Sequence, residues 1–270
     1  MTDGGNRVEF SERFVALSHG RTRYFERGDG QPILLLHGAG FMQGAETWLH
    51  TIHTLGDRHF RVLSPDLLGW GPSDKLSVPY SFAYLVDFVR EFQDSLGIAR
   101  SHIVGHSMGG WIASLLAYES PERVDKLVLA ASGGLASRPL ATMSNWMPPD
   151  PGEVELWADA YPKYDLSAAV RDRIRRSQNR DEVSNFQAIM SHMSHPETRN
   201  RYNTQRRLPR VGARTLALWG RNDAVNPLDL GIATAELIPK CELVVVESGH
   251  SIITEVPNEF NATVLAFLLR

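Results

Sequence analysis

The chain has little of three features that would place it in a special class of proteins. Its 270 residues include one cysteine, Cys241, so no internal disulfide can form, and this predicts a reducing compartment such as the cytoplasm. No apolar run approaches the ~20 residues that span a membrane, and the first ten residues lack the apolar stretch of a signal peptide. The net charge of −3 argues against general nucleic-acid binding. We therefore expect a cytoplasmic globular protein that binds neither membranes nor nucleic acids.

What is present is a regular alternation of short apolar segments and helical patterns. Hydrophobic residues make up 43% and charged residues 22%, as in ordinary globular proteins. The unbroken apolar run 32–36 predicts a strand buried on both faces of a sheet. We expect strands at 14–17, 22–26, 32–36, 61–64, 101–105, 126–131, 214–219 and 242–246, and helices at 46–57, 80–97, 111–118, 227–237 and from 257. This order predicts an α/β protein with a mostly parallel sheet covered by helices on both faces.

The alternation stops between residues 135 and 210. That stretch contains several prolines and no strong strand signal, and its helical patterns lie at 153–160, 167–177 and 181–191. We therefore predict a core made of 1–134 and 211–270, with 135–210 as a helical cap inserted over the carboxyl edge of the sheet. Residues 153–210 hold 11 basic and 8 acidic side chains, an excess that favours an anionic substrate, although a solvated helix face is the commoner role of mixed charges.

The strongest motif is Gly105-His106-Ser107-Met108-Gly109, which lies between an expected strand and an expected helix. This is the G-x-S-x-G pattern of a nucleophile elbow, in which a strained turn exposes the serine hydroxyl at the edge of the sheet. The helix that follows directs its N–H groups toward the serine oxygen. The alternative interpretation is a tight turn whose serine only caps the helix.

A nucleophilic serine needs a base and an acid to orient that base. Among ten histidines we favour His250, which lies between the last strand and the last helix, and we pair it with Asp223 in the loop after the preceding strand. Both loops open at the same sheet edge as Ser107. Asp229 is the second choice of acid, but it falls within the next expected helix. Without catalysis, Asp223 would be a turn former and His250 a loop histidine.

Backbone N–H groups near Ser107 are expected to stabilise the negative charge that develops on the substrate oxygen. The elbow supplies the Met108 N–H, and the loop after the strand 32–36 supplies a second donor, Ala39 or, as the second choice, Gly40. We expect His37 to support this loop through a hydrogen bond.

These motifs together resemble those of the α/β-hydrolase-fold serine hydrolases, and the order Ser107, Asp223, His250 is the order of that fold. More narrowly, the stretches 105–110, 133–135, 219–223, 225–229 and 249–250 resemble the meta-cleavage-product hydrolases. That family splits carbon–carbon bonds in vinylogous 1,5-diketones during the degradation of aromatic compounds. The resemblance implies the α/β-hydrolase fold, with a mostly parallel central sheet, helices on both faces and a helical cap insertion.

The chain also departs from this family near the motifs. His106 and Ser251 stand where the family typically has asparagine and tryptophan, and the loop 38–44 is longer than usual. The resemblance implies a cap arginine for a substrate carboxylate, for which we choose Arg173 among neighbouring arginines. His106 and Trp146 are further candidate substrate contacts, with packing as the alternative. Ester, thioester or lactone hydrolysis, and ligand reception on the same fold, stay open.

We expect neither a cofactor nor a metal. The pairs His50/His53 and His192/His195 each provide only two ligands, with no nearby cysteine or carboxylate to complete a metal site. The expected partner is a small molecule, and the sequence leaves a homodimer open.

Overall fold

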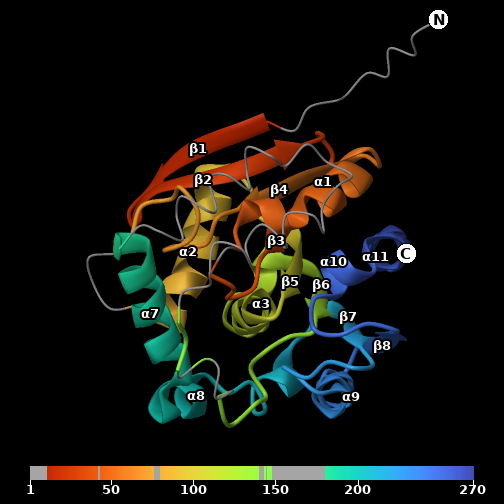
Figure 1. Cartoon of the computed structure of the whole chain (residues 1–270). Coiled ribbons are helices and arrows are strands. Elements are labelled where there is room, and N and C mark those ends of the chain that lie inside the picture. The colour runs from red at the N-terminus through yellow and green to blue at the C-terminus, as the bar shows by residue number, and fades with distance from the viewer. Residues whose placement is uncertain (1–10, 42, 76–79, 140–142, 144, 148–179) are drawn as a thin grey trace, which may run out of the picture.

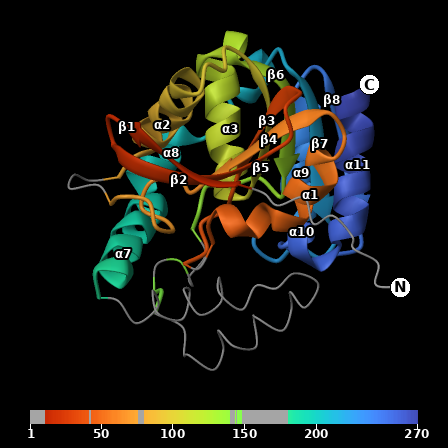
Figure 2. The same ribbon diagram turned by 90° about the horizontal axis from the view of Figure 1, so that it is seen from above.

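The computed structural model describes residues 11–41, 43–75, 80–139, 143, 145–147 and 180–270. Within these ranges no helix is long and apolar enough to cross a membrane. The described residues form a twisted sheet between two layers of helices (Figures 1 and 2).

The sheet has eight strands in the order β1-β2-β4-β3-β5-β6-β7-β8 (Figure 1). β1 and β2 form an antiparallel hairpin, β2 pairs antiparallel with β4, and the other neighbours are parallel. The strands are β1 Ser11–Leu17, β2 Gly20–Arg27, β3 Gln31–Leu36, β4 Phe60–Pro65, β5 Ser101–His106, β6 Val124–Ala130, β7 Arg214–Gly220 and β8 Cys241–Val246. The expected mostly parallel sheet is therefore confirmed.

Helices cover both faces because the central strands are apolar on both sides. One buried cluster joins the sheet to α2, α3 and the end of α9, and the other joins it to α1, α10 and α11. Figure 2 shows α3 and α11 on opposite sides of the sheet. The helices are α1 Leu49–Gly56, α2 Phe82–Ser95, α3 Met108–Glu119, α7 Arg180–Ser194, α8 Pro196–Tyr202, α9 Leu228–Leu237, α10 Ile252–Glu255 and α11 Pro257–Leu269, with 3-10 turns η1 Ala45–Trp48, η2 Pro121–Arg123 and η3 Leu208–Arg210.

Element ends differ from expectation where tertiary contacts decide them. The helix expected at 46–57 is divided into η1 and α1, and the Ala45 N–H at its start donates to the Asp66 carboxylate, a partner that no local pattern reveals. The strand expected to end at 131 ends at Ala130, because Ala131 has a φ of 45°. The short polar helix α8 was not predicted, and the helices expected at 153–160 and 167–177 lie outside the described residues.

Between β6 and β7, α7 confirms the helix expected at 181–191 and packs against the loop that follows β4. The Asn185 side chain donates to the Gly69 carbonyl and accepts from the Tyr80 hydroxyl, at 2.7 and 2.8 Å. Phe186 lies against Trp70 with a centroid distance of 6.2 Å. Asn185 and Phe186 thus attach α7 to the core.

Gly109 is a position where the fold has no room for a side chain. A Cβ at Gly109 would lie 2.1 Å from the Leu36 carbonyl oxygen, because α3 crosses very close to the end of β3. We expect Gly109→Ala to lower the free energy of unfolding by about 3 kcal/mol or more, as a steric clash in a core does. Gly212→Ala is the control, since nothing lies within 4 Å of its added Cβ, and it should change stability by less than about 0.5 kcal/mol. Urea unfolding of both variants measures the difference, and equal effects would contradict it.

Candidate active site

Ser107 stands alone between β5 and α3 in a strained backbone conformation. Its φ of 53° and ψ of −113° are rare for a residue with a side chain. Two hydrogen bonds hold this conformation: the Ser107 carbonyl accepts from Trp111 N at 3.1 Å and from Gly133 N at 2.9 Å. The turn therefore has the form of the elbow that the motif predicted.

The structure brings Ser107, His250 and Asp223 together in one hydrogen-bonded series. His250 Nε2 lies 3.0 Å from Ser107 Oγ, and His250 Nδ1 lies 2.9 Å from Asp223 Oδ2. His250 follows β8 and Asp223 follows β7, so both loops leave the sheet at the edge where β5 ends. The Asp223 side chain is fully buried, while the His250 side chain is 18% exposed. An accessible imidazole is thus oriented by an inaccessible carboxylate.

The loop after β7 fixes which oxygen of Asp223 faces the histidine. Asp223 Oδ1 accepts from the N–H groups of Val225 and Asn226, both at 2.8 Å, and this leaves Oδ2 for His250. Asp229, the second choice of acid, is an exposed residue in the first turn of α9. The geometry therefore pairs Asp223, not Asp229, with His250.

His37 shapes the loop that passes over Ser107. The Leu67 N–H donates to His37 Nε2 at 2.9 Å, so the proton of the neutral ring is on Nδ1, which donates to the Gly38 carbonyl at 2.7 Å. In a trans peptide the carbonyl and the next N–H point in opposite directions. Fixing the Gly38 carbonyl to the buried His37 therefore turns the Ala39 N–H away from that ring. His37 makes the supporting hydrogen bond that we expected.

The candidate oxyanion donors lie on the two sides of the nucleophile. Met108 is the first residue of α3, so its N–H has no partner within the helix. Within the described part of the chain, neither the Met108 N–H nor the Ala39 N–H donates to another group, and Gly40 follows directly in the same loop. A Cβ at Gly38 would stand 3.2 Å from Ser107 Cβ, so this loop runs directly beside the serine.

A buried ion-pair network that sequence reasoning missed holds the far end of this loop. Arg23 Nε lies 2.7 Å from Asp66 Oδ2, and Arg23 Nη2 lies 2.6 Å from Glu46 Oε1. Asp66 Oδ1 also accepts from the Ala45 N–H at 2.7 Å. The three charged side chains come from β2, η1 and the loop after β4, and no short motif links such distant segments.

His106, an expected substrate contact, lies beneath the site. Its ring is only 1% exposed, and its Nε2 is 2.9 Å from the carbonyl oxygen of His250. Burial lowers the pKa of His106 to about 3, so the ring is neutral in its native surroundings at ordinary pH. His106 therefore contacts the loop of the candidate base.

Buried neutral histidines make stability depend on pH. Burial also lowers the pKa of His102, to about 4. Between about pH 6.5 and pH 4, an unfolded chain binds protons at both positions while the native chain does not, so stability falls as the pH falls. We expect each histidine to contribute a slope of about 1.4 kcal/mol per pH unit there. His102→Gln should remove about half of that contribution, whereas a control change at the exposed His59, His59→Asn, should leave the slope unchanged. Denaturant unfolding at pH 6.5 to 4 gives both slopes, and equal slopes would contradict the assignment.

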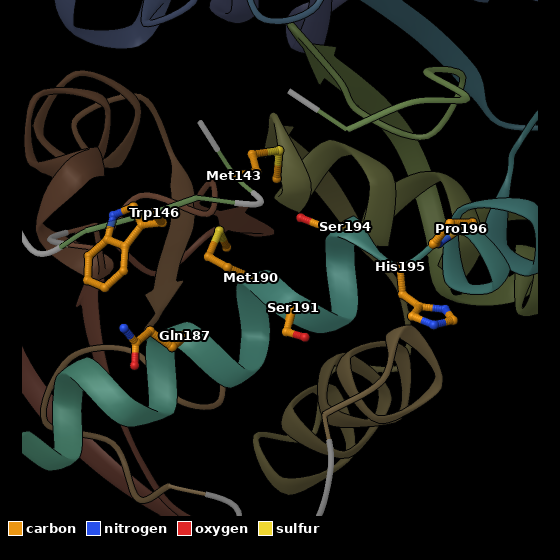
Figure 3. Close-up of a pocket in the computed structure, with 8 residues that line it drawn as sticks. All are labelled: Met143, Trp146, Gln187, Met190, Ser191, Ser194, His195 and Pro196. Carbon is orange, nitrogen blue, oxygen red and sulfur yellow. The ribbon is translucent and has the colours of Figure 1, made fainter. Parts of the chain in front are cut away.

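A cavity of about 380 Å³ lies between α7 and the segment that contains Met143 and Trp146 (Figure 3). Figure 3 shows the side chains of Met143, Trp146 and Met190 around one space, with the Ser194 hydroxyl directed toward Met143. The Trp146 ring packs on Phe41, next to Gly40, with a centroid distance of 4.9 Å. Trp146 thus joins the cavity wall to the loop beside Ser107.

Of the three tentative substrate contacts, Trp146 therefore lines a cavity and His106 is buried. Arg173 lies outside the described residues. Among the residues with a described position, no group of three or more His, Cys, Asp or Glu side chains could hold a metal ion.

The sheet order and this elbow are those of one large enzyme fold. Residues 31–257 match the alpha/beta hydrolase fold family. The chain belongs to the alpha/beta hydrolase fold family, and it is a hydrolase.

The relatives that the chain resembles are named for one kind of reaction within this fold family. Over 93% of its length the chain is 32% identical to a 2-hydroxy-6-oxononadienedioate/2-hydroxy-6-oxononatrienedioate hydrolase of Burkholderia vietnamiensis, of which it covers 91%. It is 30% identical to a 2-hydroxy-6-oxo-6-phenylhexa-2,4-dienoate hydrolase of Comamonas testosteroni, over 91% of this chain and 90% of that one. A solved meta-cleavage product hydrolase from Pseudomonas fluorescens IP01 superposes with a TM-score of 0.79 at 27% identity, covering 95% and 97%. The resemblance inferred from the motifs is therefore confirmed.

Proposed function

We propose that the chain is a serine hydrolase that cleaves a carbon–carbon bond in a small vinylogous 1,5-diketone of the meta-cleavage type. The hydrogen-bonded series Ser107, His250 and Asp223 carries the proposal. Relatives that are named for 2-hydroxy-6-oxo dienoates support the choice of substrate.

The first half of the reaction makes an acyl-enzyme. Ser107 Oγ attacks the substrate carbonyl, and neutral His250 takes the serine proton at Nε2. Asp223 holds the other ring proton on Nδ1 and stabilises the imidazolium that forms. The N–H groups of Met108 and Ala39 donate to the oxyanion, where hydrogen bonds of fixed geometry stabilise the transition state more than they stabilise the bound ketone.

The leaving group distinguishes this reaction from ester hydrolysis. When the tetrahedral intermediate collapses, the carbon–carbon bond breaks and its electron pair moves onto the dienol fragment, which takes the proton from His250. A water molecule then attacks the acyl group with His250 as base, and this releases a carboxylic acid and free Ser107. His250 thus accepts and releases one proton in each half of the reaction, and no other base is needed.

We also propose that residues 135–210 act as a cap that encloses the substrate. The cavity beside Trp146 supports this role, because its wall reaches the loop next to Ser107. Arg199 supports an anionic substrate. Its guanidinium is buried, with Nη1 donating to the Ala136 carbonyl at 3.1 Å and Nη2 3.7 Å from the Sδ of the cavity residue Met143. None of the described carboxylates pairs with it. A buried cation that no carboxylate of the described residues neutralises favours a negative ligand nearby.

Two assays test the proposal. Loss of the yellow colour of 2-hydroxy-6-oxo-6-phenylhexa-2,4-dienoate should proceed with a higher kcat/KM than hydrolysis of p-nitrophenyl acetate or butyrate. Turnover of the esters alone would replace carbon–carbon cleavage by the second candidate, ester hydrolysis, which the departures from the family pattern at His106 and Ser251 leave open. A fluorophosphonate probe should label Ser107, and a chain that stays unlabelled but binds ligands would be a receptor.

A further inference from the structure

Two side chains outside the hydrogen-bonded series hold the backbone around His250. The Glu255 carboxylate accepts from Gly249 N at 2.6 Å and from Ser251 N at 3.0 Å. His106 Nε2 lies 2.9 Å from the carbonyl oxygen of His250 itself. The N–H before His250, the N–H after it and its own carbonyl are therefore all engaged by side chains.

The contact between His106 and His250 determines which nitrogen of the His106 ring carries the proton. A carbonyl oxygen only accepts, so His106 Nε2 must donate and carries the proton, and Nδ1 of the neutral ring is bare. Nδ1 is buried without a partner within the described structure. The centroids of the two imidazoles are 5.0 Å apart, so a charged His106 would oppose the positive charge that His250 gains during the reaction. A neutral donor is the form that supports the base.

We propose that His106 and Glu255 are positioning residues, which clamp the backbone of residue 250 so that His250 Nε2 faces Ser107 Oγ. The inference rests on the proposed function, because it assigns these residues to the same reaction. Asp223 orients the His250 ring through Nδ1. The contacts of His106 and Glu255 instead fix the backbone position from which the His250 side chain extends. A misplacement of about 1 Å at a reacting group costs on the order of 100-fold in rate, so a clamp at this point has a large effect.

The position of the donor nitrogen gives a discriminating set of variants. In length, the amide nitrogen of glutamine matches histidine Nε2, whereas that of asparagine matches Nδ1. His106→Gln should therefore keep the hydrogen bond, while His106→Asn and His106→Met lose it. We expect fluorophosphonate labelling of Ser107, and kcat with little change in KM, to be at least about 10-fold lower in the last two variants, and His106→Gln to stay within about threefold of the parent. Equal rates in all three variants, whether fast or slow, would overturn the role of His106 as a donor.

Glu255 allows a second test of the clamp. Because the residue is exposed, we expect its substitution to leave the chain folded. Glu255→Ala should label about 10-fold more slowly, while Glu259→Gln, at an exposed glutamate on α11, should label at the parent rate. If thermal melting shows that the His106 variants do not fold, the labelling rate of Glu255→Ala alone tests the clamp. Labelling of Glu255→Ala at the parent rate would overturn the clamp.

A third measurement needs no activity and so separates the clamp from the proposed reaction. Imidazole nitrogen chemical shifts of the parent chain at neutral pH should show His106 as the tautomer with the proton on Nε2. The opposite tautomer would overturn the clamp even if the dienone is hydrolysed. Conversely, absent dienone turnover with normal labelling and the expected tautomer would reject the substrate and leave the clamp supported.

Discussion

Ser107→Ala should lower kcat by at least about 10⁴-fold while the chain stays folded. The variant has no oxygen to attack the carbonyl, so only binding and the oxyanion donors still contribute to catalysis. Turnover of the yellow dienone measures the loss of activity, and fluorophosphonate labelling measures the loss of the reactive hydroxyl. Thermal melting shows whether the chain is still folded. Appreciable residual turnover would place the nucleophile elsewhere.

Ser114→Ala is the matched control for this change. Ser114 lies on the same helix, α3, and its hydroxyl donates to the Gly110 carbonyl at 2.8 Å, away from His250. The control removes a buried hydroxyl without removing the one that faces the base. We expect it to be labelled as fast as the parent, and a loss equal to that of Ser107→Ala would show that α3 tolerates no such change.

Asp223→Asn should have an effect of similar size, about 10⁴-fold in kcat, for a reason that the hydrogen bonds make specific. Oδ1 accepts two backbone N–H groups, so the amide oxygen of asparagine must take that place. The amide NH₂ then faces His250 Nδ1 and donates to it. The ring is forced into the tautomer with its proton on Nε2, and that nitrogen can no longer accept the proton of Ser107.

The control for the acid is Asp229→Asn. Asp229 is six residues further along, exposed and in α9, and losing its charge should change kcat by less than about twofold. Measuring kcat for both variants between pH 6 and 9 separates a wrong tautomer from a simple pKa shift, because a tautomer defect is not recovered at high pH. Full recovery of Asp223→Asn at high pH would contradict the argument.

The sequence was sufficient to place the candidate site residues that follow a strand. Strand and helix alternation placed the ends of β5, β7 and β8 at one edge, so Ser107, Asp223 and His250 were predicted without a structure. The glycine-rich loop after β3 was also recognisable, because such loops present backbone donors. The placement of these residues could be inferred because the direction of a parallel strand fixes where its next loop must lie.

Residues that act through tertiary contacts gave no comparable signal. Glu255 is an exposed glutamate in a four-residue helix, and only the folded loop shows that its carboxylate holds both N–H groups beside His250. Arg23 and Asp66 are 43 positions apart, and neither stands in a motif. His106 was visible as an unusual neighbour of Ser107, but its hydrogen-bond partner depended on where the loop after β8 lies.

The wide spacing of Ser107 and His250 in the sequence has a consequence for when the proposed site can form. Ser107 and His250 are 143 positions apart, and they meet only after β7 and β8 have joined the sheet beside β6. Contacts of such high sequence separation form late, since a long loop must close before they are made. During synthesis the elbow therefore leaves the ribosome long before His250 is made. In the proposed mechanism, a nascent chain that carries Ser107 has no activity until β8 has joined the sheet.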